Sequence, residues 1–221
     1  MLWACILLPQ LAMDGALRGR PEPGAALALL TGPAQRRVLQ AVNPAARALG
    51  LKPGQSLTAA QALSRDFETA EYDLHEVQRW QDLLAAWGYG FSSQVSQHYP
   101  RALLMEVQSS LQLFGPWPRF EARLREELNT LGFRHRITAA PNPAAARILA
   151  NGHDGVAIHD NQQLRQYLGR MPLERLGLER DAATSLGRMG LRSLQQLLAL
   201  PRESLARRFP PQVLRLSLIH I

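Results

Sequence analysis

The sequence is poor in several residue types, and each shortage narrows what the protein can be. Cys5 is the single cysteine in 221 residues, which excludes a disulfide framework and favours a cytoplasmic location. Lys52 is the single lysine, so arginine carries almost all of the positive charge. Aromatic residues make up only 6% of the chain, and the abundance of alanine and leucine favours a helix-rich fold. The apolar run Leu2–Leu8 is too short to cross a membrane and is typical of a buried strand, so no membrane partner is expected.

The positive charge is concentrated in the C-terminal part of the chain. The net charge is +7, and residues 165–221 contain ten arginines against four acidic residues. A basic segment of this kind is a candidate surface for a polyanion such as DNA. The alternative is a set of solvated arginines in a protein that uses arginine freely.

Alternating strand and helix patterns before residue 165 indicate an α/β or α+β domain. Strands are expected at 2–8, 27–30, 36–42, 136–140 and 156–158, and as two segments within 102–114. Helices are expected at 45–49, around 74–87 and 120–131, and at 144–150 and 161–168. Thr58 is expected to begin a short helix, with Gln61 as its capping-box partner. The polar residues 65–76 are expected to form a surface connection. Short helices at 181–188, 193–199 and 202–208 follow Pro172 and predict a small helical module.

Three stretches, in this order, carry a resemblance to a known family. VLQAVNPAARALGLKPGQ (38–55) is similar to the fingers segment of Y-family (DinB/UmuC-like) translesion DNA polymerases. AAPNPAAARILA (139–150) is similar to their palm, and 173–209 to their thumb. The resemblance implies an α+β fold with palm and fingers in residues 1–164 (fingers about 20–70). It also implies a helical, helix-hairpin-helix-like thumb in residues 165–215.

The last six residues, LSLIHI (216–221), fit none of these segments. They resemble the translation of a sequencing-library adapter. We therefore expect a non-native tail on a C-terminally truncated fragment, with a natural apolar strand as the alternative.

Several residues depart from what the resemblance implies for nucleotide binding. Arg47 matches the family arginine that holds the triphosphate, but Pro44 stands at the tyrosine position and Pro143 follows Asn142 at the lysine position. In the thumb hairpin Gly177 is present, whereas Glu179 replaces a glycine and would repel a DNA phosphate.

The metal-binding carboxylates of the family are missing from the aligned positions. Nucleotidyl transfer uses two Mg²⁺ ions, which need carboxylate oxygens. The first strand offers Cys5 and Leu7, and the second position aligns to Val107 and Gln108. Glu106 is the only acid between residues 87 and 119. One carboxylate cannot hold two metals, so we expect no metal, no cofactor and no enzymatic activity.

This pattern resembles the ImuB-type mutasome subunit, a degenerate Y-family relative. The resemblance implies a DNA-binding adaptor for DNA repair, acting in SOS-induced translesion synthesis. The implied partners are primer–template DNA, a sliding clamp, a RecA-like subunit and an error-prone replicative-type polymerase. Binding to DNA should be mainly electrostatic. The candidate DNA contacts are Arg180, Arg188, Arg192, Arg207 and Arg208.

Two other functions remain open. One is an active translesion polymerase in which Glu106 and Asp14 rebuild a metal site. The other is a helix-hairpin-helix scaffold whose palm is only structural.

Single features also have competing interpretations. Residues 108–114 (QSSLQLF) resemble a sliding-clamp peptide, although a palm strand is the better explanation. His153-Asp154 and His159-Asp160 match no metal spacing. Cys5 is better explained as a core residue than as a nucleophile, because apolar surroundings make a thiol inert.

Overall fold

The computed structural model describes residues 1–178 and 180–200. It divides into two compact units. The first holds residues 1–8, 84–125 and the described chain from 135 on, and the second holds residues 9–83 and 126–134. The helices α4 (Leu74–Gly88) and α6 (Trp117–Thr130) each run from one unit into the other.

A five-stranded sheet organises the first unit, with strand order β5-β6-β1-β7-β8. Its strands are β1 (Trp3–Leu7), β5 (Val95–Ser96), β6 (Ala102–Glu106), β7 (Arg136–Ala140) and β8 (Val156–Ala157). β1 lies in the centre and pairs antiparallel with β6 and β7, while β7 and β8 are parallel. The burial of β1 on both faces explains the continuous apolar run that predicted it.

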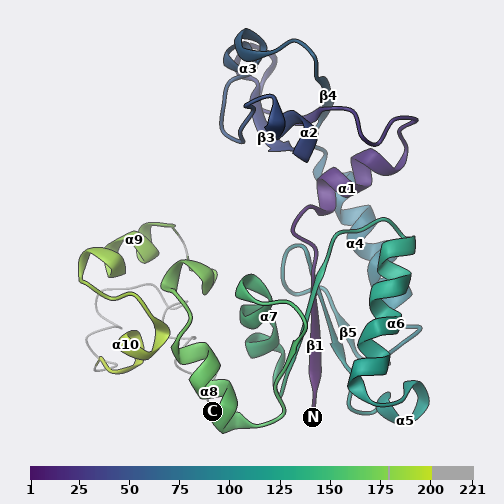
Figure 1. The fold of residues 1–221 in the computed structure, drawn as a ribbon, viewed down its shortest axis with the longest axis vertical. Coiled ribbons are helices and arrows are strands. Elements are labelled where there is room, and N and C mark those ends of the chain that lie inside the picture. The colour runs from purple at the N-terminus through teal and green to yellow at the C-terminus, as the bar shows by residue number, and fades with distance from the viewer. Residues whose placement is uncertain (179, 201–221) are drawn as a thin grey trace. The chain divides into compact units, whose positions relative to one another are not determined.

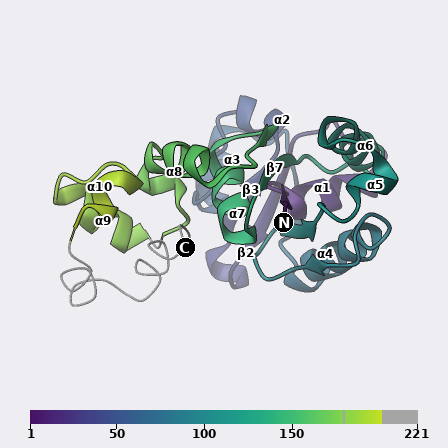
Figure 2. The same ribbon diagram turned by 90° about the horizontal axis from the view of Figure 1, so that it is seen from below.

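Helices cover both faces of this sheet. Helix α7 (Pro143–Gly152) lies against one face, and α6 lies on the other (Figures 1 and 2). Asn142 caps α7, because its Oδ1 accepts a hydrogen bond from Ala145 N at 2.8 Å, and Pro143 occupies the first turn. The predicted start of this helix is confirmed.

Shorter helices follow the sheet. They are α8 (Asn161–Gly169), η2 (Leu173–Arg175), α9 (Arg180–Arg188) and α10 (Leu194–Leu198). Leu164, Leu168, Leu186 and Leu194 are buried in the same apolar cluster as Cys5 and Leu7. Helix α8 spans the expected boundary between residues 164 and 165.

The second unit contains a three-stranded sheet of order β3-β2-β4. Its elements are α1 (Leu11–Arg18), β2 (Leu27–Thr31), η1 (Ala34–Arg36), β3 (Val38–Val42), α2 (Pro44–Ala48), α3 (Leu57–Leu63) and β4 (Glu68–Glu71). Asn43 caps α2 as predicted, and its buried side chain also bonds Leu27 N and Ala25 O.

Three local predictions are wrong. The cap of α3 is Ser56, whose Oγ accepts from Ala59 N at 3.2 Å, and not Thr58. The polar segment before α4 contains β4, an exposed strand that pairs in parallel with β2. Residues 102–114 are not two strands, because β6 ends at Glu106 and residues 111–114 form the one-turn helix α5 (Leu111–Phe114).

No described helix is long and apolar enough to cross a membrane.

Candidate functional site

The carboxyl end of β1 is the centre at which the resemblance places the first catalytic acid. Leu7 stands there, 7% exposed, directly opposite Ala102 on β6 and Arg136 on β7. The next backbone N–H, that of Leu8, donates to the carbonyl oxygen of Arg101 at 2.8 Å. The neighbours of Leu7 are therefore the loop 97–101 between β5 and β6 and the start of β7.

The prediction that Val107 and Gln108 complete this centre is wrong. Trp3 pairs with Glu106, and Val107 N donates to Leu2 O at 2.8 Å, so these residues lie at the opposite end of β1. Leu7 lies five residue steps along the chain from Leu2, which is roughly 16 Å in a strand. Two catalytic metals lie only about 4 Å apart and cannot be shared over that distance. The loop that does lie beside Leu7 reads QHYPR and contains no acid.

Glu106, the nearest palm carboxylate in sequence, holds the turn that follows its own strand. It is 4% exposed. Its oxygens accept from Gln108 N at 3.0 Å, from Ser109 N at 3.3 Å and from Ser109 Oγ at 2.5 Å. This local capping, rather than metal binding, accounts for an acid at this position.

Asp14 also has a structural partner, within the second unit. Its side chain is 3% exposed and forms an ion pair with Arg134 at 2.6 Å, with further bonds from Arg134 N and Nε at 2.9 and 2.7 Å. Burial raises the pKa of Asp14, although the hydrogen bonds and charge of Arg134 lower it. Both acids proposed to rebuild a metal site are thus already engaged. The described residues contain no group of three or more His, Cys, Asp or Glu side chains that could hold a metal.

Arginines, not carboxylates, gather around the end of β1. Arg101 comes from the β5–β6 loop, Arg136 from β7 and Arg147 from α7. The guanidinium of Arg147 lies over the ring of Tyr99, 5.9 Å from its centroid. Burial lowers the pKa of Arg147, and the charge of Arg101 lowers it further. A divalent cation would be repelled here.

Asn151 ties these arginines to the helices that follow. Its backbone carbonyl accepts from Arg136 Nη1 at 3.1 Å, and its Oδ1 accepts from Arg147 Nη1. Its Nδ2 donates to the carbonyl oxygen of Arg175 in η2 at 2.8 Å. No sequence motif identifies Asn151, Arg136 or Arg147 as neighbours, and only the strand register brings them together.

Cys5 lies on β1 two residues before Leu7 and is fully buried. Burial raises the pKa of its thiol to about 12, and the nearby Arg147 only partly opposes this. A thiol with this pKa is protonated at neutral pH and is a poor nucleophile.

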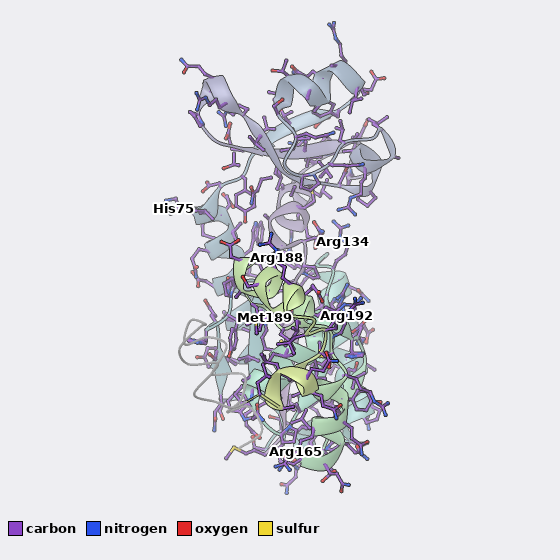
Figure 3. The ribbon with its side chains drawn as sticks, turned by 90° about the vertical axis from the view of Figure 1, so that its left-hand side faces the viewer. His75, Arg134, Arg165, Arg188, Met189 and Arg192 are labelled. Atoms are coloured by element: carbon purple, nitrogen blue, oxygen red, sulfur yellow. The ribbon has the colours of Figure 1, made fainter. Side chains whose placement is uncertain are left out.

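Two of the predicted DNA-contacting arginines, Arg188 and Arg192, lie at the turn between α9 and α10. Arg188 ends α9 and Arg192 precedes α10, and both are labelled in Figure 3. The backbone of Arg192 is fixed, because its N–H donates to Gln196 Oε1 at 2.7 Å and its carbonyl accepts from Leu173 N at 3.2 Å. Arg180 begins α9, while Arg207, Arg208 and Glu179 lie outside the described residues.

Two of the positions predicted to lie near a nucleotide, Pro44 and Arg47, are both in α2. Arg47 lies in the last turn of α2, and Pro44 opens that helix. Gly177 has a φ of 77°, which favours glycine, and precedes the undescribed position 179.

The clamp-like segment 108–114 is not an extended peptide, because it forms a turn and the one-turn helix α5. Phe114 stacks on Phe120 at 4.7 Å between ring centroids, and it lies 5.4 Å from the ring of Phe91. Leu113 points outward, with 80% exposure. Phe114 therefore anchors the end of this segment to its own unit.

The two His-Asp pairs likewise have structural roles. Asp154 accepts from Arg125 Nη2 at 2.6 Å and from Ile137 N at 2.8 Å. Asp160 caps α8 by accepting from Gln163 N at 2.9 Å. These bonds account for both aspartates without a metal.

Comparison with known proteins identifies the family. The model of the impB/mucB/samB family matches residues 18–151. The chain belongs to this family. It is 31% identical over 161 residues to Protein ImuB of Caulobacter vibrioides, which covers 73% of this chain and 35% of that protein. The chain thus spans about a third of the length of its curated relative.

Solved structures confirm the predicted Y-family fold. The chain is similar to DinB from Sulfolobus solfataricus, with a TM-score of 0.77, 16% identity, and coverage of 98% of this chain and 65% of that one. It is also similar to the insertion ternary complex of Dbh DNA polymerase, with a TM-score of 0.78, 14% identity, and coverage of 100% and 68%. At these identities the likeness concerns the fold.

Proposed function

We propose that this impB/mucB/samB family member is a non-catalytic, DNA-binding adaptor that supports damage-induced translesion synthesis by recruiting a partner polymerase. The observation that carries the proposal is the end of β1, where Leu7 faces Ala102 and Arg136 and arginines replace carboxylates. Without metals the palm lacks the main source of charge stabilisation for phosphoryl-type transfer.

The similarity to Protein ImuB supports an adaptor role in the DNA-damage response. The partners we propose are primer–template DNA, a sliding clamp, a RecA-like subunit and an error-prone replicative-type polymerase, acting in the cytoplasm. Exposed arginines such as Arg188 would hold the DNA backbone without reading its sequence.

A primer-extension assay tests the non-catalytic part of the proposal. The purified chain is mixed with labelled primer–template, all four nucleotides and Mg²⁺ or Mn²⁺, and DNA binding is measured on the same sample by fluorescence anisotropy. We expect binding without incorporation. Incorporation by protein free of contaminating polymerase would overturn the proposal in favour of an active translesion enzyme.

A further inference from the structure

A cavity of about 330 Å³ lies where α7, α8 and η2 meet. Its wall is formed by residues of these three elements and of the segments beside them, including Gly152, His153, Tyr167, Arg170, Met171 and Arg175. Its size falls at the lower end of the range for small-molecule sites, roughly 300 to 1,000 Å³. Neither Arg188 nor Arg192 lines the cavity, and no residue of β1 does. Ligand binding in this cavity would therefore be additional to the proposed adaptor function.

One side of this cavity is cationic. Arg170 and Arg175 both line it, and no aspartate or glutamate among the described residues does. Within the described part of the chain, the guanidinium of Arg170 has no hydrogen bond or ion pair. Arg175 donates a long bond, at 3.5 Å, to the carbonyl oxygen of Gly152. Two guanidinium groups without a carboxylate form a setting suited to a phosphate, which arginine can bind with two parallel hydrogen bonds.

The other side of the cavity is aromatic and apolar. The rings of His153 and Tyr167 meet edge to face, with centroids 6.0 Å apart. Tyr167 is 45% exposed, so part of its surface is open, whereas Met171 is 2% exposed and forms an apolar wall. Open aromatic faces of this kind stack on nucleobases of any sequence.

Gly152 keeps the cavity open. A Cβ atom at this position would lie 3.1 Å from Met171 Cε and 3.5 Å from Arg175 Cδ. A larger residue would therefore occupy space between the apolar and the cationic wall.

We propose that this cavity binds one nucleotide unit, with its phosphate on Arg170 and Arg175 and its base against Tyr167 and His153. The unit is either a free nucleotide or one nucleotide of a DNA strand, since both offer the same chemistry. Occupation would connect α7 and α8 to η2, the element that leads into the thumb hairpin.

Calorimetric titration of the chain in EDTA-containing buffer tests the proposal. Deoxyadenosine monophosphate should bind about tenfold more tightly than inorganic phosphate or deoxyadenosine, because only the nucleotide uses both walls. Arg170→Gln should weaken binding about tenfold. Arg165→Gln, which removes the same charge from α8 outside the cavity, should leave the affinity nearly unchanged.

Gly152→Val should abolish binding by filling the cavity, and Gly152→Ala provides a milder version if the valine variant does not fold. The same variants are measured with a short single-stranded oligonucleotide. If this oligonucleotide binds, and Arg170→Gln and Gly152→Ala weaken it while Arg165→Gln does not, the nucleotide of a strand is the occupant. Equal effects of Arg165→Gln and Arg170→Gln on both probes, or binding of neither probe, would overturn the proposal.

Discussion

Asn151 Nδ2 donates a 2.8 Å hydrogen bond to the carbonyl oxygen of Arg175, which joins the end of α7 to η2. The same side chain accepts from Arg147 through its Oδ1. A single amide thus links Arg147, near the end of β1, to η2. The two polar atoms of the amide have different partners: Nδ2 donates to η2, and Oδ1 accepts from Arg147.

Substitutions of Asn151 should separate the contributions of these two hydrogen bonds to stability. Asn151→Ala removes both side-chain bonds and should lower the free energy of unfolding by about 2 kcal/mol, at about 1 kcal/mol for each bond. Asn151→Asp keeps the acceptor for Arg147 and loses only the donor, so it should cost less. Urea unfolding gives the free energies, and amide hydrogen exchange at residues 173–177 should rise in both variants. Unchanged exchange in the alanine variant would show that the bond to Arg175 does not hold η2.

The arginines of the α9–α10 turn should set the salt dependence of DNA binding. Arg188→Gln with Arg192→Gln should weaken binding to primer–template. The slope of log K against log salt is negative, and its magnitude should decrease by about 0.9 for each phosphate that these side chains no longer neutralise. Fluorescence anisotropy between about 50 and about 200 mM salt measures this slope. Arg119→Gln with Arg165→Gln removes the same charge from exposed positions on α6 and α8 and should have a smaller effect. Equal decreases in the two double variants would assign binding to net charge alone.

Asp14 and Asp154 should respond to pH in opposite directions. Burial raises the pKa of Asp14, so its contribution to stability is present below the unfolded pKa of about 3.9 and decreases as pH rises through the folded value. Compared with the Asp14→Asn variant, whose amide does not titrate, the parent should therefore become less stable as the pH rises from below that value to neutrality.

The pKa of Asp154 is shifted in the opposite direction to that of Asp14. Burial pushes its pKa up, but the bonds from Arg125, Ile137 N and Gly155 N together lower it. Its contribution is present above the unfolded pKa and decreases as pH falls through the lowered folded value. The parent should gain stability relative to Asp154→Asn as pH rises. The gain should be about 1 kcal/mol or less, because the side chain is 46% exposed. Urea unfolding at several pH values measures both differences, and slopes of the same sign would refute this assignment.

The sequence predicts the positions of helices and strands in the chain better than it predicts strand register and long-range contacts. The apolar run of β1 and the Asn-Pro starts of α2 and α7 follow from local chemistry, and the structure confirms them. The error at Val107 and Gln108 arises because similarity of sequence does not give strand register. β6 begins beside Leu7 and ends beside Trp3, so residues close to Glu106 in sequence lie far from Leu7 in space.

Pairings made over long sequence distances are also missed. Asp14 bonds Arg134, 120 residues away, and no local pattern marks either residue as a partner. The polar strand β4 was interpreted as a surface connection because it is an exposed edge strand without an apolar face.

The register makes a sharp prediction about metal binding at the end of β1. Leu7 and Arg136 form a directly opposed pair, so their side chains lie on one face of the sheet. In an antiparallel pair the Cβ atoms are about 5 Å apart, within reach of a shared cation. Leu7→Asp with Arg136→Asp would place two carboxylates there and remove one positive charge. Arg136 is exposed, so that substitution should be well tolerated.

The matched control is Leu7→Asp with Gln108→Asp, which adds the same two carboxylates at opposite ends of β1, roughly 16 Å apart. We expect Mn²⁺ binding, measured by electron paramagnetic resonance, in the Leu7/Arg136 variant only. The parent has no carboxylate beside Leu7, and the control has one, which does not offset the repulsion from Arg101 and Arg147, so neither should bind an ion specifically. Adding Arg147→Gln to the first variant should tighten its Mn²⁺ binding for the same reason. Specific binding by the unmodified parent, or equal binding by the two double variants, would contradict both the register argument and the electrostatic account of a metal-free palm.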